Sequence, residues 1–353
     1  MSILFNKLSE RYRYFSGTKL SNWGRNKYDY LLRSGRISSY PHLVIIEPCN
    51  VCNLRCPLCP TGQRVPVARG TMSMGTFTQI IDQLFPYVRY LGLYYLGEPL
   101  LCEHLPQMIR YARHHKIKVF VSSNLNILDN KQADDLIESK LDYLIVSLDG
   151  TSQEIYEKYR VGGDCKKVIE NIRLLIDKKN EKKSPYPRLV IQTVIFRHNE
   201  DEVPKLYALA DRLGVKISIR QGALGGKGQS PPVTKDSLLA EKWLSPNKIY
   251  HKEYDYLSDK PYLRDDPCYF LWKAATINWD GSVFPCCWIY DSRHSFGNIL
   301  KENFETIWNN DLYRSSRSLF SLGKSTFLKS RGNSPETICY QCKIFKHHLN
   351  TSC

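Results

Sequence analysis

The feature that most constrains the fold is a regular alternation of short β-type runs with amphipathic stretches, which starts near residue 42. The β-type runs lie at 42–48, 90–99, 118–124, 142–150, 188–196 and 215–222. The amphipathic stretches between them lie at 77–85, 105–115, 131–139, 168–179 and 202–214. Strands that alternate with helices of this length form βα units around a parallel sheet. We therefore expect an α/β fold, a partial (β/α)6 TIM-like barrel with its active face at the C-terminal ends of the strands.

Composition changes along the chain and predicts four regions. The first, 1–41, is a basic, tyrosine-rich lead-in, and the barrel follows at 42–225. Residues 226–262 begin in a Gly-, Pro- and Ser-rich stretch that is typical of a linker or an active-site loop. The last region, 263–353, is too short for a large core of its own. We expect it to be a small C-terminal module whose fold is stabilised by bound metal.

Twelve cysteines are the second constraint on the chain. No apolar stretch reaches the length of about 18 residues that spans a membrane, and the charged N-terminus lacks the apolar run of a secretory signal. We therefore expect a cytoplasmic protein, in which thiols stay reduced and grouped cysteines serve metal or redox chemistry. The groups lie within 49–59 and 268–353, whereas Cys102 and Cys165 stand alone.

The formal net charge of +15 raises the question of an anionic partner. Basic residues are concentrated at 166–183 and 324–346, but no arginine-rich tail or RNA-binding aromatic motif accompanies them. A solvated basic surface is therefore favoured over nucleic-acid binding. An RNA-modifying enzyme remains an alternative, and it predicts RNA binding that weakens with salt.

The strongest chemical signal is the stretch CNLRCPLC, which spaces Cys52, Cys56 and Cys59 as C-x3-C-x2-C directly after a predicted strand. Three thiolates on one loop can hold three irons of a 4Fe-4S cube and leave the fourth iron open. The alternative is a structural zinc site, which needs a fourth ligand that Cys49 could supply.

This spacing resembles the signature of the radical S-adenosylmethionine (radical SAM) superfamily, and the resemblance covers roughly residues 40–225. It implies a 4Fe-4S cluster whose open iron binds the amino and carboxylate groups of S-adenosylmethionine. It also implies reductive cleavage of that cofactor to a 5′-deoxyadenosyl radical, which abstracts hydrogen from a substrate. In such an enzyme the protein supplies orientation and exclusion of water.

Further motifs follow in the order that this resemblance implies. Leu96-Gly97-Glu98-Pro99 looks like the family's GGEP motif, which receives the methionine amino group, although Leu96 replaces its first glycine. Glu98 can accept a hydrogen bond from an ammonium group, and Gly97 lets the backbone approach a ligand closely. By the same resemblance, contacts to the ribose and carboxylate of the cofactor fall to residues after the third and fourth strands and to one arginine. These are Ser122 and Asn124, Ser147 and Asp149, and Arg160.

A second cysteine set, at 263–353, resembles the SPASM domain, an auxiliary-cluster module of many radical SAM enzymes. Residues 276–287 are expected to form a hairpin with Asp280-Gly281 at its turn. The resemblance implies one auxiliary 4Fe-4S cluster on four ligands, since His348 and Ser352 stand where a second cluster would need cysteines. Cys287 and Cys353 are rival ligands, and a structural zinc on the same four remains the alternative. The expected ligands are Cys268, Cys286, Cys339 and Cys342.

The sequence thus predicts a radical SAM oxidoreductase, epimerase or peptide maturase, served by an electron donor such as flavodoxin or ferredoxin. Relatives with an auxiliary cluster mature ribosomal peptides, oxidise enzyme residues, or dehydrogenate or epimerise sugars. Only about forty residues precede the barrel, so we expect no fused peptide-recognition domain. This favours a small-molecule or sugar-like substrate over a peptide. A non-catalytic zinc-binding protein is the remaining alternative.

Overall fold

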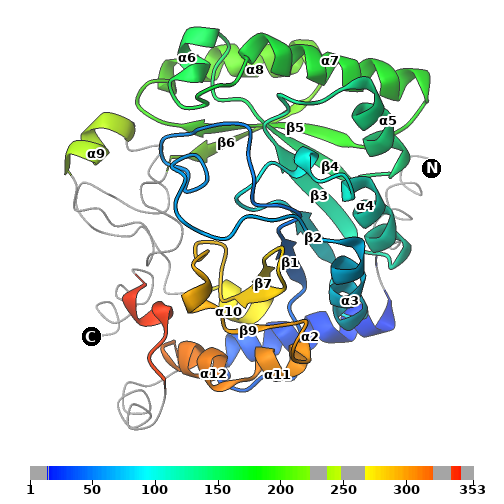
Figure 1. The fold of residues 1–353 in the computed structure, drawn as a ribbon, viewed down its shortest axis with the longest axis vertical. Coiled ribbons are helices and arrows are strands. Elements are labelled where there is room, and N and C mark those ends of the chain that lie inside the picture. Colours follow the sequence, from blue (N-terminus) through cyan, green and yellow to red (C-terminus); the bar gives the residue numbers. More distant parts are fainter. Residues whose placement is uncertain (1–13, 15, 223–236, 248–266, 321–334, 343–353) are drawn as a thin grey trace.

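The computed structural model describes residue 14 and residues 16–222, 237–247, 267–320 and 335–342 (Figure 1). The predicted linker at 226–262 lies mostly outside the described residues, as do His348, Ser352 and Cys353. One nine-stranded sheet organises the rest, in the order β6-β5-β4-β3-β2-β1-β7-β8-β9.

Six parallel strands that are neighbours in chain order form the barrel part of this sheet. They are β1 Leu43–Ile46, β2 Tyr90–Leu93, β3 Lys118–Ser123, β4 Tyr143–Ser147, β5 Arg188–Ile195 and β6 Lys216–Gln221. All six predicted strands are therefore confirmed. The second is shorter than expected, since it ends at Leu93 and is followed by a loop and a turn of 3-10 helix, η1 Pro99–Leu101. The expected α/β partial barrel is the observed fold.

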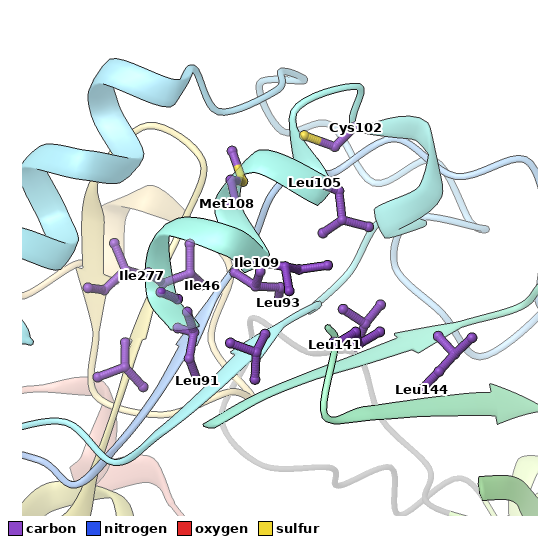
Figure 2. Packing of buried hydrophobic residues seen from close by; sticks show 14 of the residues in the cluster. Ile46, Leu91, Leu93, Cys102, Leu105, Met108, Ile109, Leu141, Leu144 and Ile277 are labelled. Carbon is purple, nitrogen blue, oxygen red and sulfur yellow. The ribbon is translucent and has the colours of Figure 1, made fainter. Parts of the chain in front are cut away.

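Helices cover the outer face of the curved sheet (Figure 1). They are α3 Met74–Leu84, α4 Leu105–His114, α5 Asn130–Glu138, α7 Cys165–Glu181 and α8 Val203–Leu213. Side-chain N-caps start several of them, including a capping box between Asp129 and Gln132 at α5. Figure 2 shows Met108 and Ile109 of α4 lying over Leu91 and Leu93 of β2. Because alternate residues along each strand face these helices, the remaining ones line the concave side.

The C-terminal module continues the barrel's sheet. Strand β7 Ala274–Ile277 pairs in parallel with β1. Strand β8 Ser282–Phe284 pairs with β7 in antiparallel fashion. The predicted hairpin is confirmed, and Gly281 occupies its turn with φ of +81°. A two-residue strand, β9 Gly297–Asn298, completes the edge. The core is continuous across this join, since Trp272 and Trp308 belong to the same buried cluster as the barrel strands. The module therefore has more core than its length suggested.

The lead-in contains a 15-residue helix, α2 Gly17–Leu31, which is attached through buried polar side chains. Asn26 donates to the carbonyl of Trp272, and Asn22 donates to the carbonyl of Tyr40. The described residues contain no helix long and apolar enough to cross a membrane. The shorter helical elements are α6 Gln153–Glu157, η2 Glu200–Glu202, α9 Ser237–Trp243, α10 Phe270–Lys273, η4 Ser292–His294, α11 Phe304–Trp308, α12 Asp311–Ser318 and η5 Ile338–Gln341.

Candidate functional site

The three cysteines of the first set lie on the loop after β1, which Figure 1 shows in blue within the curve of the sheet. The loop is tightly folded, because a Cβ added at Gly62 would lie 2.4 Å from the carbonyl oxygen of Cys56. Its backbone is anchored to the segment after α6 by a 2.9 Å bond from Arg55 N–H to the carbonyl of Val161. The thiol loop therefore has a fixed conformation at the C-terminal end of the strands.

The thiols of this loop interact with one another. The pKa of Cys52 is raised to about 12, chiefly by burial and also by the nearby Glu98, Cys56 and Cys59. Burial also raises the pKa of Cys56, while the charge and hydrogen bond of Arg160 oppose that rise. Thiolates at these positions need a compensating cation, which iron supplies. Three interacting soft thiolates from one loop thus fit the open-cornered cluster that the sequence predicted.

Cys49 does not join this set. Its Sγ donates to the carbonyl oxygen of Glu98 at 3.2 Å, and its electrostatic neighbours are Cys102, Glu47 and Glu98. Within the described ranges, no three Cys, His, Asp or Glu side chains gather closely enough to hold a single metal ion. A cube is different, since it binds each thiolate at a separate iron corner. Cys49 therefore lacks the geometry of a fourth zinc ligand.

Glu98 is buried in the loop after β2, and its carboxylate joins this loop to the one after β3. Oε1 accepts the Ser123 hydroxyl at 2.6 Å and the Leu100 N–H at 3.1 Å, and Oε2 accepts the Asn124 N–H at 2.7 Å. Burial raises the pKa of Glu98, and these donors counter that rise. Three of the roughly four lone-pair sites of the carboxylate are thus filled internally. Glu98 is a positioning residue for the loops as well as the predicted acceptor of the cofactor's ammonium.

Gly97 and Pro99 have structural reasons to be where they are. A Cβ at Gly97 would lie 2.1 Å from the carbonyl oxygen of Cys49, so only glycine lets the two loops approach. Pro99 is buried at the first position of η1. The close approach at Gly97 is thus to the chain itself, whereas the sequence had suggested a ligand.

Asn124 connects the end of β3 to the thiol loop. Its Nδ2 donates to Asn53 Oδ1 at 2.9 Å and lies 3.8 Å from Cys52 Sγ. Its Oδ1 accepts the backbone N–H of Asn126 at 3.0 Å. Asn53 and Asn126 were missed by the sequence analysis, because an asparagine after a strand is an ordinary turn residue.

Asp149 and Arg160 form a buried ion pair beside the thiol loop. Arg160 Nε donates to Asp149 Oδ2 at 2.6 Å, with side-chain exposures of 15% and 0%. Asp149 Oδ1 also accepts the Val194 N–H at 2.7 Å. The pKa of Arg160 is raised above its usual range, since the charges of Asp149 and Cys56 outweigh desolvation. Arg160 therefore belongs to a buried ion pair and not to a surface one.

The remaining predicted cofactor residues end β3 and β4 on the concave side. Ser122 pairs in register with Ile145, two residues before Ser147, so both serines lie on one face of the sheet. Ser147 is buried and Ser122 is half-buried. The structure therefore places seven of the eight predicted cofactor residues at or after the C-terminal ends of β2, β3 and β4, and the eighth, Arg160, is paired with Asp149 there.

The second cysteine set meets beside the β7–β8 hairpin. Burial raises the pKa of Cys286, and the charges of Cys287, Cys268 and Cys339 raise it further. Burial raises the pKa of Cys339 to about 12, against hydrogen bonds from Ser316 and Thr337. The Cys342 N–H donates to the carbonyl of Cys339 at 3.1 Å, so the pair shares one short segment. These thiols have the proximity and softness that an iron–sulfur cluster needs.

Cys286 and Cys287 face different surroundings, which bears on their rivalry as ligands. Cys286 packs with Cys339 against the cluster of Phe284, Ile289 and Ile338. Cys287 packs instead against the cluster of Ile45, Tyr95 and Leu96 at the barrel. The contacts favour Cys286 as the partner of Cys339.

Two family models match the chain. One, the radical SAM superfamily, matches residues 46–210, and the other, the SPASM iron–sulfur cluster-binding domain, matches residues 268–343. The chain belongs to the radical S-adenosylmethionine superfamily. Its cofactors as a radical SAM enzyme are a 4Fe-4S cluster and S-adenosylmethionine, and its SPASM domain adds auxiliary iron–sulfur binding.

Individual radical SAM relatives are distant. A tungsten-containing aldehyde ferredoxin oxidoreductase cofactor-modifying protein of Pyrococcus furiosus is 22% identical and covers 76% of this chain and 81% of its own. The mycofactocin maturase MftC of Mycobacterium ulcerans is 24% identical, and the match covers 77% of this chain and 76% of MftC. The structure of Streptococcus suis SuiB bound to S-adenosylmethionine superposes with a TM-score of 0.61 at 15% identity, over 88% of this chain and 79% of that one. The SuiB likeness shows that the two share a fold.

Proposed function

We propose that this protein is a radical SAM peptide maturase, which abstracts a hydrogen atom from a ribosomally made precursor peptide. The observation that carries the proposal is the pairing of the thiol loop with a second thiol set on the same continuous sheet. MftC, whose name describes a maturase, matches over 77% of this chain. SuiB has also been solved with its precursor peptide SuiA, at a TM-score of 0.58 and 13% identity over 93% of this chain.

In this proposal Cys52, Cys56 and Cys59 hold the catalytic cluster. When bound, that cluster supplies the electron that cleaves S-adenosylmethionine to methionine and a 5′-deoxyadenosyl radical. Glu98 and Asn124 fix the two loops that face the cofactor's methionine end. Arg160, oriented by Asp149, places a cation beside Cys56, where it can bind the cofactor's carboxylate.

The second thiol set holds the auxiliary cluster, with Cys268, Cys286, Cys339 and Cys342 as its proposed ligands. Four thiolates leave no iron corner for the cofactor, so this cluster is suited to accept an electron or to stabilise the module. The electron donor is proposed to be a flavodoxin or ferredoxin, and the location to be the cytoplasm.

The test is anaerobic reconstitution with iron and sulfide, followed by incubation with S-adenosylmethionine, a reductant and any short peptide that is found encoded beside the gene. We expect 5′-deoxyadenosine together with a mass change in the peptide, and neither product from Cys56→Ala. If the reduced protein forms no 5′-deoxyadenosine, the proposed cofactor chemistry is wrong. An unchanged peptide in a reaction that modifies a small molecule would reject the maturase assignment.

A small-molecule substrate is the second candidate. It is favoured by the P. furiosus relative, whose name describes modification of a cofactor and which matches over 294 residues. It also agrees with the expectation of a small-molecule or sugar-like substrate. The same reconstitution with small-molecule extracts separates the two candidates.

A further inference from the structure

A cavity of about 720 Å³ lies at the N-terminal ends of the strands, whereas the thiol loop lies at their C-terminal ends. Its wall includes the first residues of β3, β4, β5 and β6, which mark the N-terminal ends of the strands. The C-terminal parts of α7 and α8 close its side. The first residues of these four strands, all of which line the cavity, are Lys118, Tyr143, Arg188 and Lys216. Since the cofactor residues follow the other ends of these strands, this cavity is separate from the proposed cofactor site.

The charges that line the cavity are strongly unbalanced. Among the described residues of the lining, Lys118, Lys179, Arg188 and Lys216 contribute four cations, and Asp142 is the one carboxylate. Asp142 is already neutralised, because its Oδ2 lies 2.5 Å from Arg113 Nη1. The same oxygen accepts the Val119 N–H at 2.9 Å, and Oδ1 accepts the Tyr14 hydroxyl. The cavity is therefore a concentration of positive charge.

Within the described part of the chain, Lys118, Lys179 and Lys216 form no ion pair with a carboxylate. Lys118 instead lies 4.9 Å from the centre of the Tyr143 ring. Burial lowers the pKa of Lys179, and the charge of Arg188 lowers it further. Arg188 and Lys179 thus repel each other, and an anion between them would relieve that repulsion.

A second cavity of about 240 Å³ shares Lys118 and Tyr143 with the first and is lined also by Gln192, Ser218 and Arg220. These three residues belong to the concave faces of β5 and β6, because Gln192 pairs in register with Ser218. Arg220 adds a further cation on the side of the barrel interior. A ligand at the first cavity could therefore extend its charged groups towards this interior.

We propose that the cavity at the N-terminal ends of β3–β6 binds a small molecule that carries two or more phosphate charges. Its volume falls within the range of about 300–1,000 Å³ that is usual for small-molecule pockets. Lysine ammonium groups bind phosphate as point charges, and arginine adds a fork of parallel donors. The rings of three tyrosines, Tyr14, Tyr143 and Tyr186, give the lining an apolar wall for the body of the ligand.

The test is isothermal titration of the full-length, cluster-loaded protein with sodium pyrophosphate at low salt, in saturating S-adenosylmethionine. Citrate is titrated in parallel, since it carries a similar charge on carboxylates. The variant is Lys118→Ala/Lys216→Ala, and the matched control is Lys301→Ala, an exposed lysine outside the cavity. A melting curve on each protein verifies that it is folded.

We expect pyrophosphate to bind, and the double variant to weaken that binding at least about tenfold, as the loss of charge-assisted hydrogen bonds would. The Lys301→Ala control should bind as the unmodified protein does. No pyrophosphate binding, or equal loss in the control, overturns the proposal. Citrate binding as tight as pyrophosphate binding overturns the phosphate assignment. As a second measurement, pyrophosphate should raise the melting temperature of the unmodified protein and not of the double variant.

Discussion

The backbone N–H of Asn124 donates to Glu98 Oε2 at 2.7 Å, and this bond joins the loop after β2 to the loop after β3. Through the Asn124 side chain the connection continues to Asn53 and to Cys52 in the thiol loop. The glutamate that the sequence assigned to the cofactor therefore also holds the walls of its site together.

Glu98→Ala should lower both the stability of the protein and its affinity for S-adenosylmethionine. Its removal leaves the buried donors of Ser123, Leu100 and Asn124 without an acceptor, at a cost of about 1–3 kcal/mol. Glu98→Gln keeps one acceptor oxygen, so its stability and its affinity for S-adenosylmethionine should fall less than those of Glu98→Ala. Urea unfolding gives the stability, and equilibrium dialysis gives the affinity.

The matched control is Glu154→Ala, which removes an exposed glutamate from the surface pair with Lys158. Exposed pairs of this spacing contribute about 0.3–0.5 kcal/mol. A Glu98→Ala protein as stable as this control would show that the internal bonds of Glu98 do not hold the loops.

The six barrel strands could be predicted from the sequence because each combines β-type residues with flanking helical periodicity. The place of β7 could not, since its parallel pairing with β1 joins residues more than 200 positions apart and leaves no local pattern. The site divides in the same way. Cys52, Cys56 and Cys59 are recognisable from spacing on one loop, whereas the pairing of Arg160 with Asp149 depends on how two loops pack.

Arg160→Met should destabilise the protein strongly, because it leaves the fully buried carboxylate of Asp149 without its cation. Loss of one partner of a buried pair costs about 3–5 kcal/mol. Arg160→Lys should recover part of this loss, since it restores the charge but not the planar donor fork. Urea unfolding of Arg160→Met, Asp149→Asn and the double variant Asp149→Asn/Arg160→Met measures the coupling, and Arg160→Lys is unfolded in parallel.

Lys131→Ala serves as the comparison, because its pair with Asp135 is an exposed i,i+4 contact. That change should cost no more than about 0.5 kcal/mol. If Arg160→Met and Lys131→Ala are equally mild, the Asp149–Arg160 pair does not stabilise the fold.

The adjacent cysteines of the hairpin should differ in iron content. The reconstituted protein is expected to hold about eight irons, from two four-iron clusters. Cys286→Ala should leave about four, because its thiol faces Cys339, whereas Cys287→Ala should keep about eight. Iron and sulfide analysis after desalting measures this. If Cys287→Ala loses iron and Cys286→Ala does not, Cys287 and not Cys286 is the ligand of the auxiliary cluster.

His42 should make the protein less stable as the pH falls. Burial lowers its pKa to about 4, and the charges of Lys273 and Arg89 contribute. An unfolded histidine titrates near 6.5, so between pH 6.5 and 4 the unfolded chain binds more protons and folding weakens as the pH drops. We expect a loss of about 1–2 kcal/mol between pH 7 and pH 5. Urea unfolding at both values measures it, with His42→Gln as the comparison. An equal loss in His42→Gln would assign the effect to other groups.

Cys339→Ser tests whether the auxiliary cluster takes part in turnover. Hydrogen abstraction leaves a carbon radical on the substrate, and an oxidation must then remove one further electron, for which a nearby cluster is a plausible acceptor. The core beneath Cys339 is continuous with that of the barrel, so the module has apolar packing that does not depend on the cluster. We therefore expect Cys339→Ser to stay folded and to form 5′-deoxyadenosine, while product formation falls much more steeply. Both compounds and a melting curve should be measured on the same sample. A parallel fall of both with the melting temperature would assign the cluster a structural role instead.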